Sequence, residues 1–363
     1  MRKVRWLAEW RSSEGKPVFY HVISRVVDRR FAFGPDEKEK FRTLMRIQEK
    51  FTGCRVVSYC LMCNHFHLLL EVPPIADVGL SDQELLDRLS TIYSEAFVAV
   101  VAKELADART LAYVDENGME EARAVIHRQY NYRMHDLGEF MKGLLQRFTQ
   151  WFNRTHARTG HLWEDRFKSV IVEDGLAAKT IAAYIDLNPV RAGMVEDPAN
   201  YRWSSYGEAI GGGARGNGRT ARAGLVRALR AHEGFGADSN LWATGVSREY
   251  RKLLMAGAVG KSAESVGRDG KVVVKTLRKG IPKDGAERRD DAEISLGMML
   301  RCRVRYFTDG AVIGSRGFVN EAFSKSRERF GEKRRDGARR LKGAAAAAGE
   351  ALWSMRDLRK GIS

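Results

Sequence analysis

Two histidines separated by a single residue, His65 and His67, are the first candidates for chemistry in this sequence. They lie in the apolar segment His65–Val72, which predicts a β-strand. Side chains two positions apart in a strand share a face, so both imidazoles should project together while Phe66 and Leu68 fill the opposite, buried face. Two converging imidazoles are a partial ligand set for a metal ion. The alternative is two unconnected polar residues on a sheet surface.

An alternative metal site would combine the same histidines with cysteine. Cys60, Cys63, His65 and His67 have the ligand types of a compact zinc site. In an extended segment, however, Cys60 would face away from the other three, and structural zinc sites usually draw their second ligand pair from farther along the chain. We therefore expect free thiols, since the 4 cysteines of this chain form no disulfide framework.

Tyr184 and Asn188 form the other chemical candidate. The segment Gly175–Leu187 predicts a helix that ends before Pro189, and residues four apart share one helix face. A phenol is a poor nucleophile at its usual pKa of about 10, so it needs a cation that stabilises the phenolate or polarises a phosphate. In the structural alternative, Tyr184 is a half-buried packing residue and Asn188 terminates the helix.

Strands mixed with helices surround these residues. The apolar and β-branched segments that predict strands, besides His65–Val72, are Val18–Ser24, Arg55–Met62 and Arg166–Glu173. The three- and four-residue apolar spacing typical of helices occurs in Asp36–Phe51, Ser81–Leu105 and Leu137–Phe152. This order predicts an α+β domain.

Composition predicts both the domain boundaries of the chain and the kind of partner it binds. A Gly-rich, basic segment near residue 212 predicts a domain boundary. We therefore expect a catalytic domain over 1–212, a helical patch and flexible linker over 213–291, and a basic extension over 292–363. The 62 Lys and Arg against 46 Asp and Glu give a net charge of +16, which favours nucleic acid as partner over an ordinary basic protein without one.

Targeting signals are missing from the sequence. No segment reaches the roughly 18 apolar residues that cross a bilayer, and the first residues lack the apolar stretch of a secretory signal. We expect a cytoplasmic protein with no membrane contact.

Five blocks of sequence together resemble the REP-associated tyrosine transposases, which belong to the histidine-hydrophobic-histidine single-strand DNA nucleases. The blocks follow the family's order and are Tyr20–Arg25, Asn64–Leu70, Thr159–Lys168, Tyr184–Val190 and Trp203–Tyr206. The resemblance implies a ferredoxin-like antiparallel sheet with flanking helices, the histidine pair on a central strand and the tyrosine on a neighbouring helix. A mainly helical, basic C-terminal extension would follow, in which Tyr306–Phe318 resembles the extension of longer relatives.

The resemblance also implies roles for individual residues. His65 and His67 would hold a divalent metal, Mg²⁺ or Mn²⁺, Asn188 would complete its protein ligands, and Tyr184 would be the nucleophile. The tyrosine would displace a 3′ hydroxyl and leave a 5′ phosphotyrosine, with no need for ATP.

DNA is the implied partner, in single-stranded or hairpin form, with palindromic repeats as one candidate target. The basic and aromatic residues expected to contact it are Arg25, Arg158, Arg166, Lys168, Trp163 and Trp203. The alternative is that the tryptophans belong to the core and the cations to a solvated face. The extension, in which residues 320–363 carry 12 Lys or Arg against 6 Asp or Glu, would assist DNA binding. Either a monomer or a homodimer is compatible with the sequence.

Three functions follow. The first is a metal-dependent DNA endonuclease and strand transferase that works through a phosphotyrosine. The second is a non-catalytic regulator that binds DNA hairpins on the same fold. The third is a phosphodiesterase that uses metal-activated water.

Overall fold

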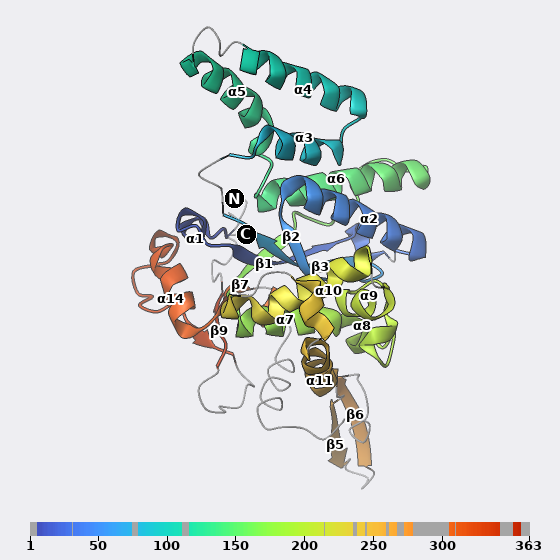
Figure 1. Cartoon of the computed structure of the whole chain (residues 1–363). Helices are drawn as coiled ribbons and strands as arrows, with labels where there is room; N and C mark the ends of the chain where they lie inside the picture. Colours follow the sequence, from blue (N-terminus) through green and yellow to red (C-terminus); the bar gives the residue numbers. More distant parts are fainter. Residues whose placement is uncertain are drawn as a thin grey trace.

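The chain folds around one large mixed sheet covered by helices (Figure 1). The computed structural model describes residues 6–30, 32–74, 79–110, 116–213, 215–234, 238–243, 245–258, 261–266, 272–278, 305–308, 310–341 and 351–356. The expected α+β class is confirmed.

The first four strands form a ferredoxin-like sheet. They are β1 (Val18–Arg25), β2 (Arg55–Leu61), β3 (His65–Val72) and β4 (Lys168–Val172), in the order β2-β3-β1-β4. Each neighbouring pair is antiparallel. The predicted antiparallel sheet is therefore confirmed, and β1 and β3 occupy its centre.

Helices cover both faces of this sheet (Figure 1). On one face lie α2 (Pro35–Thr52) and α6 (Leu137–Thr155), which share a buried apolar cluster. The other face packs against α7 (Leu176–Asp186) and α10 (Asn217–Arg230) in a second cluster. Burial on both faces explains why the central strands are almost continuously apolar.

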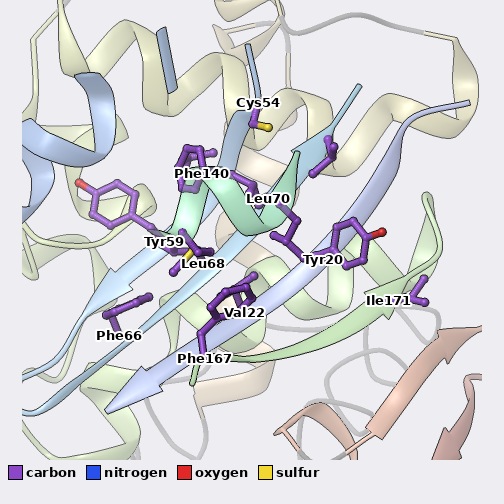
Figure 2. Packing of buried hydrophobic residues seen from close by; sticks show 14 of the residues in the cluster. Tyr20, Val22, Cys54, Tyr59, Phe66, Leu68, Leu70, Phe140, Phe167 and Ile171 are labelled. Atoms are coloured by element: carbon purple, nitrogen blue, oxygen red, sulfur yellow. The ribbon is translucent and has the colours of Figure 1, made fainter. Parts of the chain in front are cut away.

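Alternation along β3 sorts its side chains between these layers. Phe66, Leu68 and Leu70 point into the α2/α6 layer, where they belong to the same buried cluster as Phe140 (Figure 2). His65 and His67 lie on the opposite face, toward α7. The predicted register of the histidine strand is confirmed.

One predicted helix is wrong in its extent. Ser81–Leu105 was expected to be a single helix, but α3 (Asp82–Ser90) and α4 (Glu95–Thr110) are separated by a turn. A further helix, α5 (Glu116–Asn131), occupies a charged connection for which no element was predicted. These helices bury a small apolar cluster of their own, so a continuous amphipathic pattern was satisfied by two shorter helices.

The C-terminal extension adds strands to the same sheet. Strand β7 (Gly310–Gly314) pairs in parallel with β4, and β9 (Trp353–Arg356) and β8 (Arg339–Arg340) follow it. Helices α13 (Arg305–Thr308) and α14 (Arg316–Ser324) flank β7. The extension contains the expected helices, whereas its strands were not predicted.

The segment predicted as a helical patch and linker also has more structure than expected. Helix α11 (Val246–Ala258) is followed by a hairpin of β5 (Lys261–Val266) and β6 (Val272–Arg278). Residues 279–291 of the predicted linker lie outside the described residues. The boundaries at residues 212 and 291 stay predictions.

Helix α10 lies directly on β2 at Gly224. A Cβ atom there would lie 2.7 Å from the carbonyl oxygen of Val57 and 2.9 Å from that of Val56. We predict that Gly224→Ala lowers the free energy of unfolding by about 1–3 kcal/mol, because two backbones would have to separate. This exceeds the roughly 0.5–1 kcal/mol that alanine usually contributes to a helix.

The measurement is urea unfolding, with Gly211→Ala as matched control, because a Cβ at Gly211 meets no atom within 4 Å. Equal unfolding midpoints for the two variants would contradict the close approach.

Candidate active site

A chain of hydrogen bonds links two buried histidines to the C-terminal extension. His67 is 3% exposed, and its Nδ1 lies 3.0 Å from Nε2 of His21, which is 0% exposed on β1. The Nδ1 of His21 lies 2.8 Å from the backbone oxygen of Phe307 in α13. The two imidazole rings stack with centroids 5.3 Å apart.

His21 was missed by the sequence analysis. The available signal was a single imidazole within an apolar strand, on the face that Phe19 and Ile23 share. Its partner could not be predicted, because 46 residues separate it from His67 and 286 from Phe307.

His65 completes the predicted pair. Its ring centroid lies 5.1 Å from that of His67, so the two imidazoles come together as the strand spacing predicted. The Nδ1 of His65 lies 2.7 Å from Oδ1 of Asn64, and the Nδ2 of Asn64 donates to the backbone oxygen of Arg29. Because the amide nitrogen is used in that way, Asn64 presents its oxygen to His65, which must therefore donate through Nδ1.

All three imidazoles are held neutral by their surroundings. Burial lowers the pKa of His21 to about 4, and burial together with the charge of Arg25 lowers the pKa of His65 to about 4. Burial, followed by the neighbouring imidazoles, holds the pKa of His67 well below its usual value. Neutral imidazoles keep the lone pair that metal binding requires.

Tyr184 lies against the same histidines. Its ring centroid is 5.8 Å from those of both His21 and His67, with edge-to-face geometry. The ring of Phe307 lies 4.8 Å away, and the guanidinium of Arg191 lies 4.7 Å from the Tyr184 centroid. The phenol is 2% exposed, so three distant segments enclose it rather than leave it at the surface.

Asn188 is placed by hydrogen bonds to the end of α7. Its Nδ2 donates to the backbone oxygens of Tyr184 and Ile185, each at 3.1 Å, and Asn188 begins the short helix α8 (Asn188–Arg191). This matches the helix-terminating alternative. The amide oxygen is the atom of Asn188 suited to a cation, because the nitrogen is a donor.

The donor set is compatible with a metal ion that takes its other ligands from outside. Among the described residues, no group of three or more His, Cys, Asp or Glu is arranged to hold a metal. The two imidazoles of His65 and His67 therefore need oxygen ligands from Asn188, water or a phosphate. Two imidazoles alone suit zinc better than Mg²⁺ or Mn²⁺, which prefer oxygen ligands.

The expectation that Cys60 faces away from His67 was wrong. Cys60 pairs with His67 across the β2–β3 hairpin and shares its face, because the chain turns between the two strands. Its Sγ contacts Sδ of Met62 at 3.6 Å, and burial raises the pKa of the Cys60 thiol well above its usual range. A buried thiol that resists ionisation is a poor zinc ligand.

The cations expected to contact DNA differ in exposure. Arg166 and Lys168 are exposed, whereas Arg25 is half-buried and lies opposite His65 at the end of β1. Arg158 is half-buried and donates to the backbone oxygen of His161. Arg25 ends β1 and Lys168 begins β4, which pairs antiparallel with β1, so these two cations lie at the same end of the sheet.

The two tryptophans have internal partners. Trp163 packs against Phe66 and Phe148, and its Nε1 donates to Oγ1 of Thr149 at 2.9 Å. Trp203 donates from Nε1 to Glu39, and the Lys38 ammonium lies 4.6 Å from its ring centroid. These contacts favour the packing alternative for Trp163 and leave Trp203 half-buried.

A basic hollow between α2 and α6 was missed by the sequence analysis. It has a volume of about 320 Å³, and none of its lining residues is acidic; they are Lys40, Leu44, Arg147, Gln150, Trp151 and Arg154. The available signal was the helical spacing of Arg147, Trp151 and Arg154, which places them on one face of α6.

Comparison with known proteins links part of the chain to a family. Residues 16–109 match the family model described as transposase IS200 like, a segment that includes His21, His65 and His67. A solved structure described as a REP-associated tyrosine transposase bound to a REP hairpin is similar over 60% of this chain and 88% of that chain, with 10% identity and a TM-score of 0.35. No curated protein matches the chain. In the described part of the chain, every helix is too short or too polar to cross a membrane.

Proposed function

On the premise that residues 16–109 match the IS200-like transposases, we propose that this protein is a transposase that cuts and rejoins single-stranded or hairpin DNA through Tyr184. One observation carries the proposal. The Tyr184 ring lies 5.8 Å from that of His67, which lies 5.1 Å from His65. A nucleophile and a two-imidazole donor set thus share one site, although they come from different elements.

Each residue of the proposed site has its own role in the reaction. His65 and His67, with the Asn188 oxygen, would hold a divalent cation, which when bound polarises the scissile phosphate. Tyr184 Oη forms the new bond to phosphorus, the bond from phosphorus to the 3′ oxygen breaks, and that oxygen takes up a proton. The phenol proton of Tyr184 is lost as the leaving 3′ oxygen gains one, so the products are a 5′ phosphotyrosine and a free 3′ hydroxyl, and attack by another 3′ hydroxyl reverses the step.

Two further side chains shape this step. The Arg191 guanidinium beside the Tyr184 ring favours negative charge on the phenol oxygen. The Phe307 ring covers Tyr184, so this side chain must move aside before a DNA strand reaches the phenol. In the proposal, exposure of the nucleophile therefore precedes its contact with DNA.

The test is a single-stranded hairpin oligonucleotide incubated with the full chain and Mn²⁺, then run on a denaturing gel. A 3′-labelled strand is expected to give a slow, protease-sensitive band, because the tyrosine keeps the 5′ end of the downstream fragment. A 5′-labelled strand should give only a shortened product. Chelation of the metal should remove both products.

Two other outcomes would favour the alternatives. Shortened products from both labels, without a protein-linked band, would indicate a phosphodiesterase that uses water. Retention of the hairpin on a native gel without cleavage under any metal condition would indicate a binding regulator.

The basic hollow between α2 and α6 is our candidate for the DNA backbone. We predict that the double variant Lys40→Gln/Arg154→Gln weakens hairpin binding roughly tenfold. The magnitude of the slope of log K against log salt should fall by about 1–2, because the variant contacts fewer phosphates and its binding releases fewer counterions.

The measurement is fluorescence anisotropy with a labelled hairpin over a range of salt concentrations. Lys142→Gln is the matched control, since Lys142 is an exposed cation of the same helix α6 that lies outside the hollow. An identical salt slope for the double variant and the control would show that the hollow does not contact the DNA.

A further inference from the structure

We infer that His21 is a positioning residue that fixes which nitrogen of His67 carries the lone pair, and that the carbonyl of Phe307 in the C-terminal extension sets His21 in turn. The inference rests on the proposed metal-dependent function. It assigns roles to two residues for which the sequence analysis gave none.

The first step concerns His21. A backbone carbonyl can only accept a hydrogen bond, so the 2.8 Å contact from Phe307 requires a proton on Nδ1 of His21. A neutral imidazole carries one N–H proton, which leaves the lone pair on Nε2. The ring is 0% exposed, and burial favours this neutral form.

The second step concerns the protonated nitrogen of His67. Because Nε2 of His21 is an acceptor, the 3.0 Å contact requires a proton on Nδ1 of His67. The lone pair of His67 therefore lies on Nε2. Asn64 imposes the same tautomer on His65 by accepting from its Nδ1. His65 and His67 thus both carry their lone pair on Nε2. Metal-binding histidines commonly have this arrangement, in which the other ring nitrogen donates a hydrogen bond to a neighbouring group.

The third step explains why the extension belongs to the site. Phe307 lies in α13, three residues before β7, and β7 pairs with β4 through Val312 opposite Ile171. This pairing fixes the extension to the same sheet as β1, so the Phe307 carbonyl is held at a constant position over His21. The match to the transposase family covers residues 16–109, and Phe307 lies outside it.

The binding test uses Mn²⁺ alone with full-length, DNA-free protein. His21→Leu removes the acceptor and is expected to weaken Mn²⁺ binding about 10–100-fold, measured by electron paramagnetic resonance or calorimetry. His21→Gln retains an acceptor oxygen near the Nε2 position and should restore most of the affinity. A folded His21→Leu protein with wild-type Mn²⁺ affinity would overturn the inference. A purely structural role for His21 would not produce a loss of Mn²⁺ affinity that glutamine restores.

The tautomer is measured directly, in metal-free protein with ¹⁵N-labelled histidine. Long-range ¹H–¹⁵N spectra of the wild type should show His67 protonated on Nδ1, and His21→Gln should keep this form. A wild-type His67 protonated on Nε2 would overturn the inference even if His21→Leu fails to fold.

The two proposals can fail separately. Wild-type protein that binds no Mn²⁺, or whose affinity is unchanged in His65→Ala, would defeat the metal-dependent function. The spectra would still determine whether His67 is protonated on Nδ1.

Discussion

Tyr184→Phe is expected to abolish the protein–DNA adduct, with a loss of at least about 10³-fold, while hairpin affinity stays within about twofold of wild type. The substitution removes only the hydroxyl that forms the bond to phosphorus. The ring and its contacts with His21, His67 and Phe307 remain, so the fold and the DNA surface should be unaffected. Quantified adduct on denaturing gels and anisotropy on the same preparations measure the two effects.

A matched control is Tyr59→Phe. Tyr59 is also fully buried, but it faces the α2/α6 layer on the other side of the sheet (Figure 2). This variant should keep wild-type adduct formation. If the adduct survives in Tyr184→Phe, another tyrosine is the nucleophile. Cleavage without an adduct would instead support attack by water.

The metal-free protein is expected to lose stability steeply between about pH 6.5 and pH 4. In this window the unfolded chain protonates its histidines, whereas the folded pKa of His21 and of His65 is about 4 and that of His67 is well below its usual value. The unfolded state then binds more protons, so the free energy of unfolding falls as pH falls, by up to about 1.4 kcal/mol per pH unit for each group.

A carboxyl near the site acts in the opposite direction. Burial raises the pKa of Asp186 to about 7, so below that value the folded state takes up a proton before the unfolded state does. This stabilises the fold as pH falls and offsets one of the three histidines. The net expectation is that the free energy of unfolding falls by about 3 kcal/mol per pH unit.

Urea unfolding with chelator at pH 7, 6 and 5 measures this dependence. His21→Gln should flatten the slope by about 1.4 kcal/mol per pH unit, because one buried imidazole no longer differs between the folded and unfolded states. Stability that stays constant from pH 7 to pH 5 would contradict the burial of neutral imidazoles. Saturating Mn²⁺ should add a further loss on acidification, since protons compete with the metal for the same nitrogens.

The sequence by itself determined the local features of this protein. The alternation of His65 with Phe66 and of His67 with Leu68 placed the histidines on one face of a strand, because side-chain direction in a strand depends only on position. The helix that carries Tyr184 followed from the same kind of periodicity, and its end from Pro189. Basic composition indicated a polyanionic partner.

Tertiary structure decided everything that depends on which segments meet. The turn between β2 and β3 brought Cys60 to the face of His67, against the expectation for an extended chain. The register of β1 against β3 placed His21 beside His67, and the pairing of β7 with β4 placed Phe307 over both His21 and Tyr184. Such contacts join residues tens to hundreds of positions apart, and their choice depends on packing that competes over the whole chain, so no local pattern encodes them.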